Sequence, residues 1–195
     1  FALRCVYIED QRKDTLLYAK EIKVDLSRLS LEKKIISFKK ITLNKVYFNL
    51  KQYKGDSVLN LDFLIQAFAS SDTTPSTGPP LKLAAKKLIL IDTRFNFIDE
   101  NDTASNYGML YGNLRVTNLN TEINDVRMFQ DTIFCDIQKL SLKERCGFEL
   151  KEFSTKAKLS DHIMDCDKLK IKTGLSNIDV QHLTFSYNVY RDWQD

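Results

Sequence analysis

Two segments of the chain repeat each other, and this repeat constrains the fold more than any other feature of the sequence. Residues 41–52 (ITLNKVYFNLKQ) align without gaps on residues 88–99 (LILIDTRFNFID), with Asn49 matched to Asn96. Alternation of apolar and polar residues is typical of a β-strand with one apolar face, so both copies are predicted to be strands. The matched apolar pairs are Ile41 and Leu88, Leu43 and Leu90, Phe48 and Phe95, and Leu50 and Phe97.

The alternation changes phase in the middle of each copy, between Leu43 and Phe48 and between Leu90 and Phe95. One extra residue in a strand produces such a change, because successive side chains point to opposite faces of a sheet. The sequence therefore predicts a β-bulge or kink near Lys45 and another near Asp92. A weaker third copy, with one more inserted residue, is indicated by Leu140, Leu142, Phe148 and Leu150.

Kinked strands that repeat and share an apolar face predict a mainly β chain with a long, curved, antiparallel sheet, whose concave face is apolar and whose core extends lengthwise. The alternative is a closed two-sheet sandwich, in which the same apolar residues pack on each other. Periodicity does not distinguish a face covered by protein from one covered by lipid, and the pattern alone favours the sandwich by about two to one.

The remaining elements follow from composition and local pattern. Gly (6) and Pro (3) are scarce while Phe (12) and Tyr (8) are plentiful, which indicates long strands joined by polar turns. Residues 29–38 fit either a short helix or a broken strand. Further strands are predicted near residues 3–9, 15–26, 39–52, 81–99, 107–118, 121–129, 132–143, 146–160, 166–173 and 178–190.

One amphipathic helix is predicted near residues 60–69, with Asn60 as its N-cap. Its apolar stripe is Leu61, Leu64, Ile65 and Phe68. Residues 70–80 (SSDTTPSTGPP) are predicted to form a Pro-, Ser- and Thr-rich loop. This loop separates strands and helix in residues 1–69 from a continued β-sheet in residues 81–195, and the two parts are expected to form one continuous fold.

Several kinds of chemistry find no support in the sequence. The 29 Lys and Arg and 26 Asp and Glu residues are interspersed along the chain, which does not match a nucleic-acid-binding footprint. His162 and His182 have no patterned Cys or carboxylate partner. The carboxylates Asp161, Asp165 and Asp167 are interpreted as a solvated turn rather than a calcium loop. We therefore predict no enzyme activity, no metal and no cofactor.

The four cysteines, Cys5, Cys135, Cys146 and Cys166, show no metal-ligand spacing. We interpret them as free thiols buried as small apolar groups. A bridge between Cys135 and Cys146 on adjacent strands is the alternative in an oxidising compartment.

Four segments of the first hundred residues resemble the AsmA/TamB family of bacterial envelope proteins, in the form found in Bacteroidetes-type bacteria. Two of them, 6–10 (VYIED) and 14–25 (DTLLYAKEIKVD), are similar to the N-terminal part of TamB proteins. The other two, 41–50 (ITLNKVYFNL) and 55–64 (GDSVLNLDFL), resemble a strand, turn and helix-start pattern shared with AsmA proteins. The remainder of the chain resembles the family only in general character, and the four cysteines are not part of the family pattern.

The resemblance implies a periplasmic protein held to the inner membrane by an N-terminal transmembrane anchor. It implies a long, taco-shaped sheet with an apolar concave face, similar in plan to the chorein-type lipid transporters of eukaryotes. The implied function is phospholipid transport between the inner and outer membranes, and outer-membrane biogenesis with a barrel assembly partner.

Two functions from different classes follow. In the first, the repeated strands bind phospholipid acyl chains through Ile41, Leu43, Phe48, Leu50, Leu88, Leu90, Phe95 and Phe97. In the second, the sheet is a non-lipid periplasmic scaffold or interaction module that assists outer-membrane protein assembly. The absence of small or polar residues at these eight positions favours the first.

Overall fold

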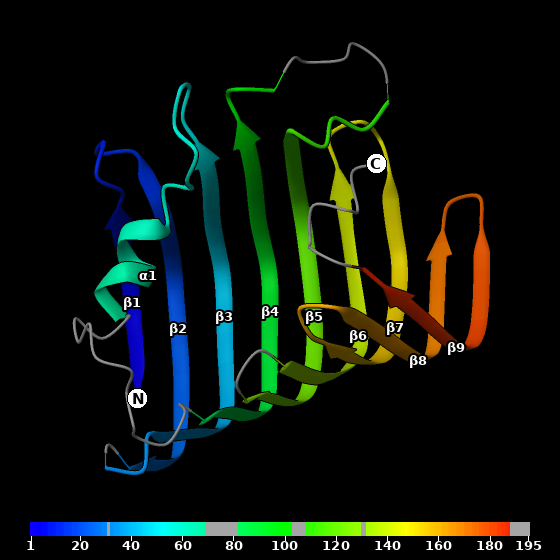
Figure 1. Cartoon of the computed structure of the whole chain (residues 1–195), viewed down its shortest axis with the longest axis horizontal. Coiled ribbons are helices and arrows are strands. Elements are labelled where there is room, and N and C mark those ends of the chain that lie inside the picture. Colours follow the sequence, from blue (N-terminus) through cyan, green and yellow to red (C-terminus); the bar gives the residue numbers. More distant parts are fainter. Residues whose placement is uncertain (31, 69–81, 103–107, 130–131, 188–195) are drawn as a thin grey trace.

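The computed structural model describes residues 1–30, 32–68, 82–102, 108–129 and 132–187, and most of these residues lie in β-strands (Figure 1). The loop expected at residues 70–80 lies outside the described residues. The strands are β1 (Ala2–Glu9), β2 (Thr15–Ser30), β3 (Ile35–Gln52), β4 (Lys82–Asp99), β5 (Asn113–Phe129), β6 (Thr132–Glu144), β7 (Glu149–Leu159), β8 (Ile163–Thr173) and β9 (Asn177–Ser186), and the one helix described is α1 (Asp62–Phe68).

The nine strands form a single sheet in which their spatial order is their order in the chain. Figure 1 shows long, bent strands side by side from β1 to β9, so the sheet is curved. The prediction of a mainly β chain is confirmed. The described residues form no second sheet, and the closed sandwich is therefore not the fold that they adopt.

The expectation of an antiparallel sheet is wrong at one junction. Strands β3 and β4 are parallel, whereas the other neighbouring pairs are antiparallel. A parallel connection must bring the chain back to the start of the first strand, which takes a dozen or more residues. The long connection from Gln52 to Lys82, which includes α1, is sufficient for that return.

The sequence repeat coincides with the parallel pairing. Ile41 pairs with Leu88 and each later residue of the ladder keeps the same offset as far as Gln52 and Asp99. The predicted bulge or kink is present at both positions, because Lys45 and Asp92 each have a φ of 50° in the left-handed region, although β2 and β3 keep one register across Lys45. Since both strands carry their extra residue at the same level, the register between them is unbroken.

The prediction of a third copy of the repeat is wrong. Leu140 and Leu142 lie on β6, Phe148 lies in the connection that follows, and Leu150 lies on the antiparallel strand β7. Leu142 pairs with Leu150 across the two strands. The similarity therefore spans a hairpin, where apolar alternation on both arms imitates a single kinked strand.

Two other strand predictions are corrected. Residues 107–118 and 121–129 were expected to be separate, but a single strand β5 covers both from Asn113 onward. The register shifts between Thr117 and Asn120, and Asn118 has a φ of 51°, so the phase change marks a bulge and not a strand end. Residues 29–38 contain the end of β2 and the start of β3, which excludes the short helix.

Left-handed residues form a line across the first half of the sheet. Cys5 on β1, Lys45 on β3, Asp92 on β4 and Asn118 on β5 have φ values of 50° to 52°, and the strand registers place them at neighbouring levels. Bulges bend a strand and increase its twist, so a line of them bends the sheet as a whole.

Small side chains lie beside this line of bulges. Ala19 is 0% exposed, Val46 is 5% exposed and Thr93 is 6% exposed. Ala19 and Val46 are paired across β2 and β3. Side chains on the inner side of a bend are crowded together, which explains why these positions hold Ala, Val and Thr while larger residues stand farther from the bend.

The bulge at Lys45 reverses the usual effect of a strand-forming substitution. We expect Lys45→Val to lower the free energy of unfolding by about 1–2 kcal/mol, because a β-branched residue is strained at positive φ. Lys45→Gly should be neutral or stabilising by up to about 1 kcal/mol. Urea unfolding checks both values. Lys40→Val, at an exposed position of the same strand, is the control and should cost little; a loss equal to that of Lys45→Val would contradict the account.

The chain has little enclosed core for its size. Its accessible surface is 13408 Å², compared with roughly 9,500 Å² expected for a globular protein of this mass. Among the described residues, Leu16 is the large side chain buried to below 2% exposure. A single curved sheet, with no second sheet over it among the described residues, accounts for both observations.

Candidate apolar binding surface

The structure brings the eight predicted binding residues together on two neighbouring strands. The residues of β3 pair one to one with those of β4 in the parallel ladder. All eight side chains are half-buried. The rings of Phe48 and Phe95 lie with their centroids 6.1 Å apart and their planes tilted by 31°, a common aromatic packing geometry.

Apolar residues of the adjacent strands continue this patch on both sides. Paired residues in a sheet point to the same face, so each cross-strand partner of the eight extends a row across the sheet. The sequence analysis missed these partners, although each lies in an alternating segment. They are Leu17, Ile22 and Val24 on β2, and Leu114, Val116 and Ile123 on β5.

The rows run on into the second half of the sheet. Ile123 pairs with Ile137 on β6. One further row joins Leu140 to Phe153, then to Ile171 and to Ile178, which together cross four strands from β6 to β9. We call all of these residues, on β2 to β9, the apolar rows.

Three threonines interrupt the apolar side of the sheet. The hydroxyls of two of them donate hydrogen bonds to backbone carbonyls where the pairing between strands is irregular. Thr121 donates a hydrogen bond to the carbonyl of Lys139 at 2.9 Å, and Thr155 donates to the carbonyl of Asp167 at 3.0 Å. Both lie beside register shifts, where a carbonyl loses its regular partner. The Thr93 hydroxyl is buried and has no hydrogen-bond partner.

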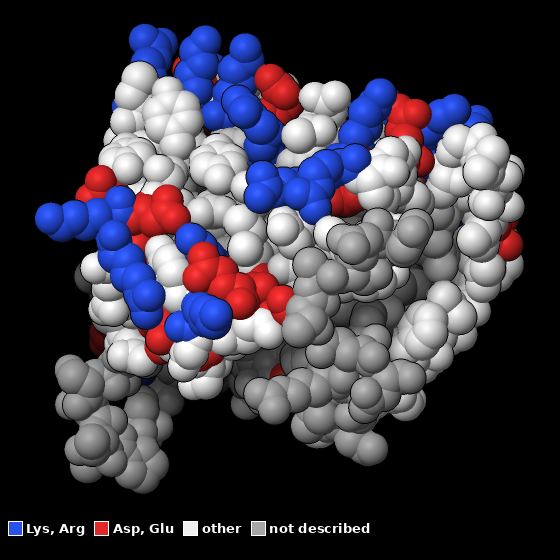
Figure 2. Space-filling view, turned by 90° about the horizontal axis from the view of Figure 1, so that it is seen from above, with Lys and Arg blue, Asp and Glu red and all other residues white. Residues whose placement is uncertain are grey.

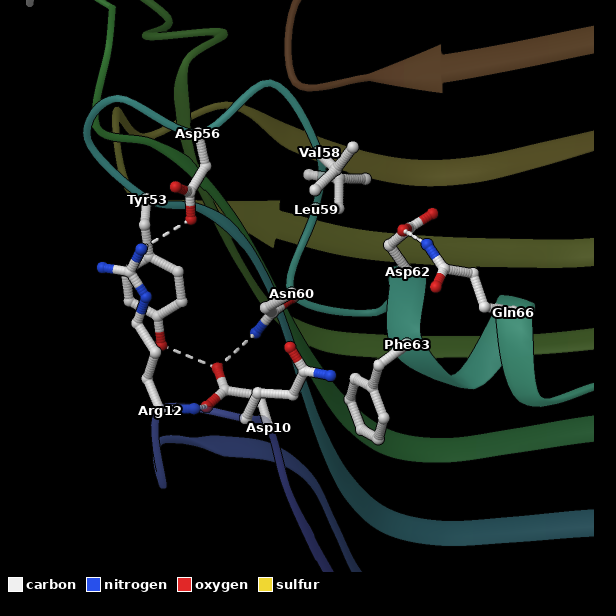
Figure 3. A pocket seen from close by; sticks show the side chains of 11 residues that line it. Asp10, Arg12, Tyr53, Asp56, Val58, Leu59, Asn60, Asp62, Phe63 and Gln66 are labelled. Atoms are coloured by element: carbon white, nitrogen blue, oxygen red, sulfur yellow. Dashed lines mark hydrogen bonds and ion pairs between the residues drawn. The ribbon is translucent and has the colours of Figure 1, made fainter.

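A cluster of polar side chains lies at one end of the sheet (Figure 3), around the buried carboxylate of Asp10, which is 6% exposed. Tyr53 donates a hydrogen bond to Asp10 Oδ2 at 2.6 Å, and Asn60 donates to the same oxygen at 3.0 Å. Burial and the adjacent carboxylate raise the pKa of Tyr53, which keeps its hydroxyl protonated as the donor. The cluster ties the turn after β1 to the chain that follows β3.

Cations hold the outer side of the same cluster. The Arg12 guanidinium lies 4.2 Å from the centroid of the Tyr53 ring, and Arg12 Nη2 pairs with Asp56 at 2.7 Å (Figure 3). Lys51 Nζ lies 4.5 Å from the same centroid and 2.9 Å from Glu100. Glu100 holds the pKa of Lys51 above its usual value, against the effect of burial.

Asn60 does not cap the helix as predicted. Its Oδ1 accepts a hydrogen bond from the backbone N–H of Lys51 at 2.9 Å, and its side-chain amide donates to Asp10 and to the carbonyl of Asn49. The side chain is therefore committed to β3 and to the polar cluster. The helix begins later, at Asp62.

Acid should weaken the contribution of Asp10 to stability. Burial acts to raise its pKa, but hydrogen bonds from Tyr53, Asn60 and the backbone N–H groups of Asp14 and Arg12 outweigh burial and hold the pKa below its usual 3.8. As the pH falls below about 4, the unfolded chain takes up the proton first, so this stabilisation is complete above pH 4 and is lost through the lower, folded pKa.

Asp10→Asn should therefore reduce the free energy of unfolding by roughly 1–3 kcal/mol at pH 7 and by less at pH 3. Urea unfolding of both proteins at the two pH values measures the difference. The exposed Asp161→Asn variant is the control and should change little at either pH. An equal loss for Asp10→Asn at both pH values would contradict the assignment.

His182 has a carboxylate partner that the sequence analysis missed. Its Nδ1 lies 2.7 Å from Asp167 Oδ1, which raises the pKa of the imidazole, and its Nε2 lies 2.9 Å from the Thr184 hydroxyl. Asp165 and Asp167 lie on β8 and not in a turn, as had been expected. Only the register of the β8–β9 hairpin, in which Asp167 is opposite His182, brings these groups together.

The cysteines differ from the sequence interpretation. Cys166 is buried and Cys135 half-buried, and burial raises the pKa of both thiols, but Cys5 and Cys146 are exposed. Cys135 lies near the start of β6 and Cys146 beyond its end, roughly 25–30 Å apart along an extended strand. A disulfide requires Cα atoms within about 7 Å, so the alternative bridge between these two residues is excluded.

Two features of the described residues and two comparisons with known proteins add little to this geometry. No described helix is both long and apolar enough to cross a bilayer, and the described His, Cys, Asp and Glu side chains form no group of three suited to a metal ion. A scan against models of known protein families finds no match, and a search of curated proteins finds none. The AsmA/TamB resemblance therefore stays a sequence-based expectation.

Proposed function

We propose that the apolar rows line the concave side of the sheet and form an open groove for phospholipid acyl chains. In this proposal the protein is a non-catalytic, bridge-like element of lipid transport between the inner and outer membranes. The observation that carries the proposal is that the apolar rows extend from β2 to β9, interrupted by Thr121 and Thr155, on a sheet with no described second layer.

Differences in burial support the assignment of the apolar rows to the concave side. On β8, Leu169 is 5% exposed and Cys166 is 6% exposed, whereas Lys168 and Lys170 are exposed. In a single-layer sheet, a side chain in mid-strand is covered mainly by neighbours on its own face. Curvature towards a face crowds its side chains, so the more buried face is expected to be the concave one.

The charges support the same arrangement. Figure 2 shows Lys and Arg along the upper margin of the molecule, further Lys and Arg mixed with Asp and Glu on its left-hand side, and mostly uncharged residues on its right-hand side. Cross-strand ion pairs such as Lys87–Glu122 (2.7 Å) and Lys143–Glu149 (3.1 Å) occupy positions that alternate with the apolar rows. Exposed ion pairs contribute little stability, but they keep one face of the sheet hydrated and leave the other for apolar ligands.

The free energy of acyl-chain burial suits a protein that binds lipid and lets it move. Each acyl CH₂ removed from water contributes about 0.8 kcal/mol, so a chain of a dozen or more carbons binds well. The eight predicted acyl-chain-binding residues of β3 and β4 carry no side-chain hydrogen-bond donor or acceptor. An acyl chain can then move along the rows with little change in free energy.

We also propose that α1 belongs to the end of this groove. Phe63 of the helix lines a hollow of about 240 Å³ together with Asp10 and Tyr53, which supports a position of α1 beside the polar cluster (Figure 3). The side chains of Ile65 and Phe68 lie outside the described ones.

The cellular part of the proposal rests on the sequence resemblance. It comprises the periplasmic location, the inner-membrane anchor and an outer-membrane barrel partner. The alternative, a scaffold that assists outer-membrane protein assembly without carrying lipid, needs no continuous apolar rows.

Lipid extraction from the purified chain tests the proposal. We expect mass spectrometry to detect co-purified phospholipid at a stoichiometry that falls when detergent is added and returns after incubation with vesicles. A folded chain that carries no phospholipid before or after incubation would exclude the transport function and leave the scaffold.

A further inference from the structure

Strand β9 forms one border of the sheet, and the outer edge of residues 177–184 has no strand partner among the described residues. It pairs with β8 along its length without a register shift. No strand in the part of the chain that the structure describes pairs with its other side. The outer edge of such a strand presents backbone N–H and C=O groups to any extended segment that approaches it.

The two borders of the sheet differ in how they discourage such pairing. Strand β9 (NIDVQHLTFS) contains no Lys, Arg or Pro and no residue with positive φ. Strand β1, at the other border, contains Arg4 and the left-handed residue Cys5. Bulges and Lys or Arg side chains protect edge strands from further pairing, and β9 lacks both.

The apolar rows extend as far as β9, the strand at the open border. Ile178 pairs with Ile171, and Val180 pairs with Leu169. Ile178 is 44% exposed at the border, whereas Ile171 one strand inward is half-buried. One more strand with an apolar residue opposite Ile178 would cover it as its inner neighbours are covered.

The charged residues of β8 and β9 indicate which charged residues an added strand would carry. Charges alternate in sign across the strands: Lys156 is opposite Asp167, which is opposite His182. In the adjoining row Lys170 is opposite Asp179, with Nζ and Oδ2 3.8 Å apart. Opposite charges on facing residues stabilise a sheet, so the alternation calls for a basic residue beyond Asp179 and an acidic residue beyond His182.

We propose that the outer edge of β9 binds an extended segment of a partner protein, which adds a further strand to the sheet. The partner segment alternates apolar and polar residues, with Lys or Arg facing Asp179 and Asp or Glu facing His182. Backbone hydrogen bonds provide most of the affinity and the two charges provide selectivity. This inference rests on the edge of the sheet and does not depend on lipid binding to its face.

Synthetic peptides test the proposal against the whole chain. A labelled ten-residue peptide of the stated pattern carries Lys opposite Asp179, and its matched control carries Glu there. We expect the Lys peptide to bind about three- to fivefold more tightly by fluorescence anisotropy. Asp179→Lys should reverse this preference, with an unchanged far-ultraviolet circular dichroism spectrum.

Two further measurements locate the peptide. Hydrogen exchange should slow in Asn177–Ser186 and stay unchanged in Ala2–Glu9. N-methylation of the peptide amides that face β9 should weaken binding at least tenfold, whereas methylation of the outward amides should not. Equal binding of both peptides, protection confined to the apolar rows, or a dimer of the chain joined through β9 would each overturn the proposal.

Discussion

Phe95→Glu should abolish capture of phospholipid by the folded chain. Phe95 lies at the centre of the apolar rows, between Phe48 on β3 and Val116 on β5. A carboxylate there would have to lose its hydration when an acyl chain covers it, which costs several kcal/mol and exceeds the contribution of the few CH₂ groups that contact this position. Photo-crosslinking with a diazirine-labelled phospholipid measures the capture. Phe48→Glu should abolish capture in the same way.

Ile91→Glu is the matched control for this experiment. It introduces the same charge on the same strand, but Ile91 follows Leu90 directly and so points to the opposite face, where it is 43% exposed. Capture by Ile91→Glu should equal that of the unmodified chain. Undiminished capture by a folded Phe95→Glu variant would exclude lipid binding at this face, and parallel circular dichroism spectra would show that both variants remain β-rich.

Leu16→Ala and Leu17→Ala should differ widely in stability although the two residues are adjacent on β2. Leu16 is 1% exposed, so its truncation leaves a cavity and should cost about 3 kcal/mol of unfolding free energy. Leu17 pairs with Phe48 in the apolar rows and is half-buried. Because the Leu17 side chain is only partly removed from water on folding, its truncation should lower the free energy of unfolding by only about 1 kcal/mol.

The comparison matters because an open groove and a closed core predict different results. If the protein itself covered the apolar rows, Leu17 would be as costly to truncate as Leu16. Urea unfolding in the absence of lipid gives both values, and equal losses of about 3 kcal/mol would contradict an open surface. Saturation with phospholipid should raise the stability of the unmodified chain, because a ligand that binds only the folded state stabilises it.

The internal repeat predicted the central strands and their bulges, because side-chain alternation in a strand has a period of two and any phase change needs an extra residue. It did not predict that β3 and β4 are parallel. Alternation is the same in both directions of a strand, so strand direction depends on the connection between Gln52 and Lys82 and not on the repeat itself.

The polar contacts could not be predicted for a different reason. Asp10 is 43 residues from Tyr53 and 50 residues from Asn60 in the chain, and it meets them only because β1, β2 and β3 are adjacent. The pairing of His182 with Asp167 likewise needs the register of one hairpin. Sequence patterns report which face a residue occupies, whereas these contacts depend on pairings that are set by the whole sheet.

The most direct test of the account is a map of the sites at which an acyl-chain diazirine attaches to the folded chain. Mass spectrometry of the labelled peptides should place the attachments in the apolar rows of several strands, including Leu90 and Phe95 on β4 and Phe153 on β7, and none at Ile89 or Ile91 on the other face. Attachments confined to the other face, or absent from a folded chain saturated with lipid, would contradict an apolar groove that is open to acyl chains.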